Sequence, residues 1–214
     1  MTDTALTDLQ RLVLAMFFEL PESDGFVLAG GAALVASGLT DRPTLDVDLF
    51  GSDRDVGISE AADALEAACV ARGWSIEQIR DATTFRRIVV RRSQDELLVD
   101  IAIDSPPLGV PVITAVGPTY PPQELAARKL LALHDRAEAR DFVDVHALSD
   151  GFDLDGLLGL AAELDTGFTP QLLAEMLGSH VRFSDAELAD LGAEPSRLRA
   201  FVDEWRTQLA GGDR

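Results

Sequence analysis

The chain has 214 residues, 47% of them hydrophobic, and a formal net charge of −19, which suits one large domain or two small ones. The acidic charge disfavours non-specific binding to DNA or RNA, although a nucleic-acid end can still enter a local basic cleft. No apolar run approaches the roughly 18–20 residues that span a bilayer, and the acidic N-terminus does not resemble a signal peptide. With Cys69 as the single cysteine, no internal disulfide forms, so we expect a cytoplasmic protein without membrane segments.

The first half of the chain combines helical and strand patterns. The spacing of apolar residues predicts a helix over 5–20 that ends at Pro21, and another over 59–72. A short helix is expected over 32–38. Strands are predicted at 26–29, 44–50, 74–78, 85–91 and 97–103. This order predicts an α/β lobe with a mixed sheet.

A glycine pair, Gly30-Gly31, stands between the first predicted strand and a helix. The N-terminus of a helix presents unpaired backbone N–H groups, which favour a bound anion. The pair is therefore a candidate phosphate-binding turn. A tight strand-to-helix turn without a ligand is the alternative, because two adjacent glycines alone are a weak signal.

Two aspartates, Asp46 and Asp48, alternate with apolar residues in the strand that follows. Because alternate side chains of a strand share a face, both carboxylates lie opposite Leu45, Val47 and Leu49. Neighbouring carboxylates repel each other unless a cation lies between them, and Mg²⁺ and Mn²⁺ prefer oxygen ligands. A phosphate-binding turn next to a carboxylate pair predicts metal-assisted phosphoryl or nucleotidyl transfer.

A third carboxylate is expected from the predicted strand 97–103, which repeats the same alternation. Asp100 and Asp104 lie opposite the apolar residues of this strand. Asp104 directly precedes Ser105-Pro106-Pro107, so capping a turn is its expected role. We therefore favour Asp100 as the third metal ligand or general base.

Residues 105–122 are rich in proline, and we interpret them as a loop or linker. Beyond them only helices are predicted, at 123–134, 139–148, 154–164, 170–177, 185–191 and 195–209. The expected architecture is thus an α/β catalytic lobe over residues 1–115 and a helical lobe over residues 116–214, with a cleft between them.

The helical lobe contains Lys129, the one lysine beside 17 arginines. Every other basic side chain apart from the histidines is an arginine, so this lysine indicates a position that needs a compact ammonium group. The expected role of that group is to face a triphosphate. A lysine that snorkels at a domain interface is the alternative. Nearby, Arg140 and Asp144 fit an ordinary surface pair four residues apart, and Asp141 fits a first-turn acid that complements the helix dipole.

Arginines also cluster in the predicted strand 85–91, as Arg86-Arg87 and then Arg91-Arg92. One interpretation is an edge strand that its charges protect from aggregation. The other is a surface for an RNA end.

Two segments of this sequence resemble the signatures of the AbiEii/AbiGii-like nucleotidyltransferase toxins. The first combines Val27–Leu34 with Arg42–Leu49, and the second runs from Glu124 to Asp144. The resemblance covers roughly residues 25–150. It implies the nucleotidyltransferase fold of the DNA polymerase β superfamily and a toxin of a bacterial toxin–antitoxin pair.

By this resemblance the chain transfers a nucleotide from a nucleoside triphosphate to RNA, at the 3′ end of a tRNA, with Mg²⁺ or Mn²⁺. A cognate antitoxin is the implied protein partner. The residues carried over are Asp46 and Asp48 as metal ligands, and Gly30, Gly31, Arg42, Lys129 and Asp141 as nucleotide-binding residues. Ala32 stands where the wider superfamily has serine, so that phosphate contact is missing. Modification of a small molecule or a protein hydroxyl, or a non-catalytic binding role, remain alternative functions.

Overall fold

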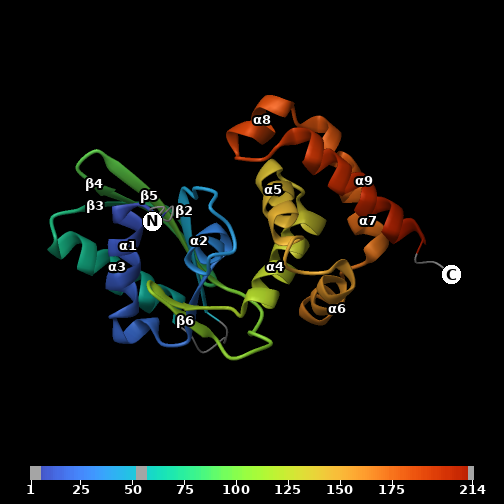
Figure 1. Cartoon of the computed structure of the whole chain (residues 1–214). Coiled ribbons are helices and arrows are strands. Elements are labelled where there is room, and N and C mark those ends of the chain that lie inside the picture. Colours follow the sequence, from blue (N-terminus) through green and yellow to red (C-terminus); the bar gives the residue numbers. More distant parts are fainter. Residues whose placement is uncertain (1–5, 52–56, 212–214) are drawn as a thin grey trace. The chain divides into compact units, whose positions relative to one another are not determined.

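The structure is a computed structural model that describes residues 6–51 and 57–211. The chain forms two compact units, Met1–Pro121 and Pro122–Arg214, which are coloured along the sequence in Figure 1. None of the helices in the described ranges is long and apolar enough to cross a membrane.

The first unit is built on a seven-stranded mixed sheet in the order β3-β4-β5-β2-β1-β7-β6. Strand β2 pairs antiparallel with β1 and parallel with β5, and β5 pairs antiparallel with β4. The strands are β1 (Phe26–Ala29), β2 (Asp46–Gly51), β3 (Ser75–Ala82), β4 (Phe85–Arg92), β5 (Asp95–Ile103), β6 (Val112–Thr114) and β7 (Gly117–Thr119).

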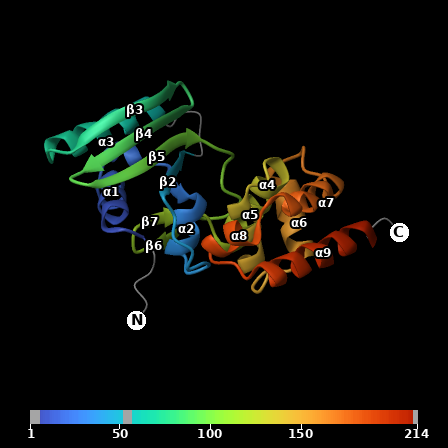
Figure 2. The same cartoon turned by 90° about the horizontal axis from the view of Figure 1, so that it is seen from above.

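Helices α1 (Asp8–Phe18) and α3 (Ile58–Ala71) pack against each other and against one face of the sheet, as Figure 2 shows. Apolar residues at alternate strand positions point to these helices and form the core. Fully buried examples are Val13, Phe17, Val47, Leu49, Leu65, Ile88, Val99 and Ile101. The other face of β2, β5 and β4 therefore carries the remaining residues of each strand, which include the polar ones.

Three expectations for this unit are wrong in detail. Leu45 is 85% exposed and precedes β2, because the strand begins only at Asp46. The proline-rich segment 105–122 contains β6 and β7, each of three residues, which is too short to produce an alternating pattern. Strand β4 is not an edge strand, because β3 covers its outer side.

The second unit is helical in the part that the structure describes. Its helices are α4 (Pro122–Asp135), α5 (Ala139–Leu148), α6 (Leu154–Leu164), α7 (Pro170–Gly178), α8 (Asp185–Asp190) and α9 (Pro195–Gly211). Helix α4 packs against α5, α6 and α7, and α7 also packs against α9. Leu130, Leu133, Phe142, Leu173 and Leu198 are fully buried between them. The predicted mixed α/β half and helical half are both confirmed.

Candidate active site

The alternation of β2 places its two aspartates on one face. Val47 and Leu49 are fully buried, whereas Asp46 and Asp48 are half-buried on the opposite side. The site therefore begins with two carboxylates on the sheet face that α1 and α3 leave open.

Strand pairing extends this pair into a row. Asp48 is opposite Asp100 in the parallel pairing of β2 with β5, and Asp100 is opposite Arg87 in the antiparallel pairing of β5 with β4. Directly opposed residues of neighbouring strands point to the same face. We call Asp46, Asp48 and Asp100 the acid row, and Arg87 closes it on the β4 side.

Arg87 binds Asp100 through two nearly parallel hydrogen bonds. Its Nε donates to Oδ1 at 2.7 Å and its Nη2 to Oδ2 at 2.6 Å, a bidentate geometry that favours arginine over lysine. The hydrogen bond to Asp100 raises the pKa of Arg87, and the charges of Asp48 and Asp46 raise it further. All three carboxylates therefore stabilise the positive charge of the Arg87 guanidinium.

The glycine pair lies directly against the acid row. Gly30 has a φ of +63°, and a Cβ atom there would lie 1.8 Å from Oδ2 of Asp48. A Cβ on Gly31 would lie 2.8 Å from Oγ1 of Thr44 and 3.4 Å from Nη2 of Arg42. Helix α2 (Gly30–Ala36) begins at this pair, two residues earlier than expected. The close approach explains why side chains are not tolerated at these two positions without a shift of Asp48 or Thr44.

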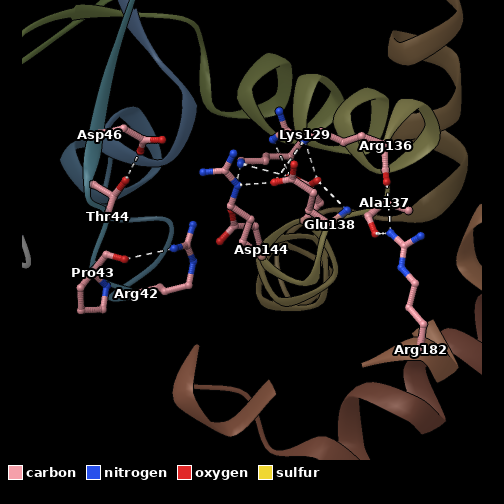
Figure 3. Close-up of polar contacts among 12 residues, drawn as sticks. Arg42, Pro43, Thr44, Asp46, Lys129, Arg136, Ala137, Glu138, Asp144 and Arg182 are labelled. Atoms are coloured by element: carbon pink, nitrogen blue, oxygen red, sulfur yellow. Dashed lines mark hydrogen bonds and ion pairs between the residues drawn. The ribbon is translucent and has the colours of Figure 1, made fainter. Parts of the chain in front are cut away.

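The segment that leads into β2 is held by polar contacts. Oγ1 of Thr44 donates to Oδ1 of Asp46 at 2.8 Å, and Nη1 of Arg42 donates to the carbonyl of Pro43 at 3.0 Å, as drawn in Figure 3. The buried Gln10 of α1 donates from Nε2 to the carbonyls of Thr44, at 2.9 Å, and Asp46, at 3.4 Å. Thr44 and Gln10 therefore fix where Asp46 leaves the loop.

Asp104 has a different environment from Asp100. Its N–H donates to the carbonyl of Gly51 at 3.0 Å, and its Oδ1 accepts the N–H of Ser105 at 2.7 Å. These contacts are those of a residue that caps the end of β5, as the sequence indicates.

The helical unit contains a second group of charges, Lys129, Arg136, Asp141 and Asp144, which we call the lysine cluster. Nζ of Lys129 lies 2.9 Å from Oδ2 of Asp144 and 3.7 Å from Oδ1 of Asp141. Arg136 donates to both oxygens of Asp141, from Nε at 2.9 Å and from Nη2 at 3.0 Å. Lys129, Arg136 and Asp144 are labelled in Figure 3.

Lys129, Asp141 and Asp144 of the lysine cluster are buried, whereas Arg136 is exposed, and this burial corrects one interpretation of the sequence. Asp141 and Asp144 are both 0% exposed, so Asp144 does not belong to a surface pair. Asp141 also accepts the N–H of Glu138 at 3.1 Å and closes a capping box at the start of α5. It is therefore the first-turn acid that its position indicated, in addition to its contacts with two cations.

Most arginines of β4 and its surroundings are matched by acids. Arg86 is buried and contacts Asp63, Glu66 and Asp81, so it joins α3 to the sheet. Arg91 contacts Glu77 and Glu96, and Arg92 contacts Asp95. These three arginines form an internal network of ion pairs rather than a bare basic surface.

Sequence reasoning identified the carboxylates and glycines of the site but missed Arg87, Thr44 and Gln10. One signal was available for Arg87, which alternates with the apolar Ile88 and Val90 in a strand. For Gln10 the signal was a polar residue on the buried side of an amphipathic helix. The acid row, the glycine pair and Arg42 lie in the first unit, and Lys129 and Asp141 lie in the second.

The donor chemistry of the acid row suits Mg²⁺ or Mn²⁺, because all its ligand atoms are carboxylate oxygens. In the described residues, no group of three or more His, Cys, Asp or Glu side chains is arranged to hold a metal ion. Asp46 and Asp48 supply two carboxylates, while Asp100 directs both oxygens to Arg87. Each of these oxygens accepts only one hydrogen bond from Arg87, so a second lone pair on each is still able to coordinate a cation.

A family model described as "Nucleotidyl transferase AbiEii toxin, Type IV TA system" matches residues 11–211. The chain belongs to the AbiEii family. It is thus a nucleotidyltransferase toxin of a type IV toxin–antitoxin system, as its resemblance to these toxins implied. No curated protein matches the chain.

Solved structures confirm the fold of this AbiEii protein. MenT4, a nucleotidyltransferase toxin from Mycobacterium tuberculosis, aligns with a TM-score of 0.67 at 18% identity, over 96% of this chain and 82% of its own. JHP933 from Helicobacter pylori aligns with a TM-score of 0.58 at 19% identity, over 98% of this chain and 95% of its own. At these identities the similarity establishes the fold, whereas the roles of individual residues must come from the site itself.

Proposed function

We propose that this AbiEii toxin transfers a nucleotide from a nucleoside triphosphate to the 3′ end of an RNA, a tRNA, in a reaction that depends on Mg²⁺ or Mn²⁺. The observation that carries the proposal is the acid row beside the glycine pair. Three carboxylates share one sheet face with Arg87, next to a helix start whose two glycines pack closely against Asp48 and Thr44.

Asp46, Asp48 and Asp100 are the residues that would hold the metal. Bound there, the metal supplies positive charge that activates the attacking hydroxyl and stabilises the leaving pyrophosphate. Gly30 and Gly31 bind the triphosphate through their backbone at the start of α2, where a side chain would collide with Asp48 or Thr44. Arg42, whose Nη2 lies near Gly31, adds a positive charge at the same end.

In the proposed reaction one bond to phosphorus forms and one breaks. The acceptor hydroxyl oxygen forms a bond to the α-phosphorus, the bond from the α-phosphorus to the bridging oxygen breaks, and pyrophosphate leaves. The hydroxyl proton passes to a carboxylate oxygen of Asp100 and then to water. Each carboxylate oxygen of Asp100 has a lone pair that Arg87 does not use, so Arg87 holds Asp100 in place while it accepts the proton.

In the helical unit we propose Lys129 and Asp141 as nucleotide-binding residues. An ammonium group has three N–H donors, and Asp144 and Asp141 lie near Nζ of Lys129. Of these two acids only Asp144, at 2.9 Å, lies within hydrogen-bond distance, so the ammonium group has further donors for a phosphate oxygen. Asp141, fixed by Arg136, orients this lysine.

A second candidate acceptor is a small molecule or a protein hydroxyl, and the net charge of −19 favours it over a long nucleic acid. A non-catalytic binding role is disfavoured, because the carboxylates and glycines of the site are all present. An antitoxin is the expected protein partner, as the type IV family description supports.

The proposal is tested by incubating the protein with each labelled nucleoside triphosphate, Mg²⁺ or Mn²⁺, and total RNA. We expect label in RNA of tRNA size, and none when a chelator is present. Label in protein or in a small molecule instead of RNA would support the second candidate. No labelled product with any nucleotide would contradict nucleotidyl transfer altogether.

A further inference from the structure

The open sheet face continues beyond the acid row onto β4 and β3. Arg80 of β3 is opposite Arg87 of β4, so both point to the face that carries Asp100. Phe85 lies two residues before Arg87 on the same face. Cζ of Arg80 lies 5.2 Å from the centroid of the Phe85 ring, and Cζ of Arg87 lies 5.6 Å from it. We call Arg80, Phe85 and Arg87 the Arg–Phe–Arg group.

Within this group Arg87 is paired with Asp100, whereas Arg80 carries a positive charge that no acid of the described residues neutralises. Arg80 is exposed, and it makes no ion pair within residues 6–51 and 57–211. Arg87 uses Nε and Nη2 for Asp100, and its Nη1 has no hydrogen-bond partner among the described residues. Arg86, Arg91 and Arg92, in contrast, are all held by acids.

We propose that the Arg–Phe–Arg group binds the single-stranded 3′ end of the acceptor RNA. A base stacks on the half-buried ring of Phe85, and backbone phosphates contact Arg80 and Nη1 of Arg87. Aromatic rings combined with arginines are the usual means of binding single strands, since every base has a π-face and every nucleotide a phosphate. This inference rests on the proposed function, because it names where that reaction's acceptor lies.

The order of the strands indicates the side from which the acceptor hydroxyl approaches the acid row. The glycine pair follows β1, which lies on one side of β2, and the Arg–Phe–Arg group lies on the other side, beyond β5. The attacking and leaving oxygens of a phosphoryl transfer are roughly in line. If pyrophosphate leaves on the glycine side, the acceptor hydroxyl enters from the side of β4 and β3.

The overall acidity of the chain is compatible with this surface. A net charge of −19 repels the backbone of a long nucleic acid. Two arginines and one ring suffice for a terminal segment of a few nucleotides, in which stacking contributes much of the affinity. The group therefore selects an unpaired end over a duplex.

The test is the binding of a fluorescent short single-stranded RNA with a free 3′ hydroxyl, measured by anisotropy without nucleotide. Phe85→Leu keeps an apolar side chain but removes the π-face, and we expect roughly tenfold weaker binding. Phe85→Tyr restores the ring and should bind like the wild type. Arg80→Gln should weaken binding and reduce the slope of log K against log salt by about 0.7.

Arg72→Gln is the matched control, because Arg72 is also exposed but follows α3, the helix on the opposite sheet face. It should leave RNA binding unchanged. Equal affinity in the wild type, Phe85→Leu and Arg80→Gln would overturn the inference, as would binding of the duplex form as tightly as the single strand.

The outcomes separate this inference from the proposed function. RNA binding that depends on Phe85 and Arg80, without nucleotide transfer, would support the surface and contradict the reaction. Transfer to RNA with the same KM for RNA in Phe85→Leu and Arg80→Gln would support the reaction and overturn the surface. Transfer to a protein hydroxyl without RNA binding would overturn both the RNA acceptor and this surface.

Discussion

The acid row and the lysine cluster use the same residue types with opposite results. The acid row places three carboxylates on one sheet face, and two of them, those of Asp46 and Asp48, are only half-buried. The lysine cluster has two carboxylates for two cations, and both carboxylates are fully buried. Carboxylates with access to solvent can reach a ligand, whereas the buried carboxylates of the lysine cluster, held by Lys129 and Arg136, stabilise the fold.

This difference predicts whether a mutation in each group changes the stability or the activity of the protein. A buried ion pair that loses one partner leaves an uncompensated charge in a low-dielectric environment, which is strongly destabilising. A carboxylate that is removed from a crowded acidic row relieves repulsion instead. Mutations in the lysine cluster should therefore be detected in stability, and those in the acid row in activity.

The largest effect on stability is expected for Asp144→Asn. Nζ of Lys129 then loses the opposite charge at 2.9 Å, which leaves a buried cation without full compensation, and the free energy of unfolding should fall by about 3 kcal/mol. The measurement is denaturant unfolding followed by circular dichroism. Asp203→Asn, at an exposed position of α9, is the control and should change the free energy by less than about 0.5 kcal/mol. Equal effects of the two substitutions would show that the cluster does not stabilise the unit.

A combined effect on stability and activity is expected for Gly30→Ala. The φ of +63° costs alanine about 1–2 kcal/mol, and the new Cβ must displace the Asp48 carboxylate that lies 1.8 Å from it. Nucleotide transfer should therefore be lost.

Gly38→Ala provides the matched control for Gly30→Ala. Gly38 has a similar φ of +67°, but no atom lies within 4 Å of a Cβ there. The Gly38→Ala protein should lose only the stability that the backbone strain costs, and it should keep its transfer activity. If Gly30→Ala were as active as Gly38→Ala, the close contact with Asp48 would have no functional role.

The smallest effect concerns His146 of the helical unit, which packs against Phe201. Burial lowers the pKa of His146 below its usual 6.5. Below pH 6.5 the unfolded chain therefore binds a proton that the folded protein does not, and stability falls as the pH decreases until the folded-state pKa is reached.

The test of this pH effect compares the wild type with His146→Gln between pH 7.5 and pH 5. The difference in unfolding free energy should change across this window, because only the wild type has the titrating ring. A constant difference would show that the ring titrates equally in both states.

The sequence was sufficient for features that depend on local periodicity. Alternation in β2 and β5 placed Asp46, Asp48 and Asp100 opposite the core, and the apolar spacing of α4 to α9 gave helices within a few residues of their bounds. Both signals arise from side chains that meet the core at regular intervals. Strands β6 and β7 were missed because three residues contain no period.

Local sequence patterns could not predict the contacts between distant segments of the chain. Arg87 belongs to the site because β4 pairs with β5 in one register, and a shift of one residue would turn it toward α3. Gln10 reaches Thr44 and Asp46 only because α1 packs beside the start of β2. The burial of Asp144 likewise depends on how α5 packs against α4, which no spacing within α5 indicates.

The most direct test of the central claim is nucleotide transfer by Asp48→Asn, compared with the wild type on the same RNA and with the same labelled nucleotide. The amide keeps the size of the side chain but removes a charge from the acid row. We predict transfer reduced by roughly a thousandfold, with a thermal midpoint equal to or above that of the wild type. A folded Asp48→Asn protein that transfers nucleotide at the wild-type rate would contradict the assignment of the acid row as the active site.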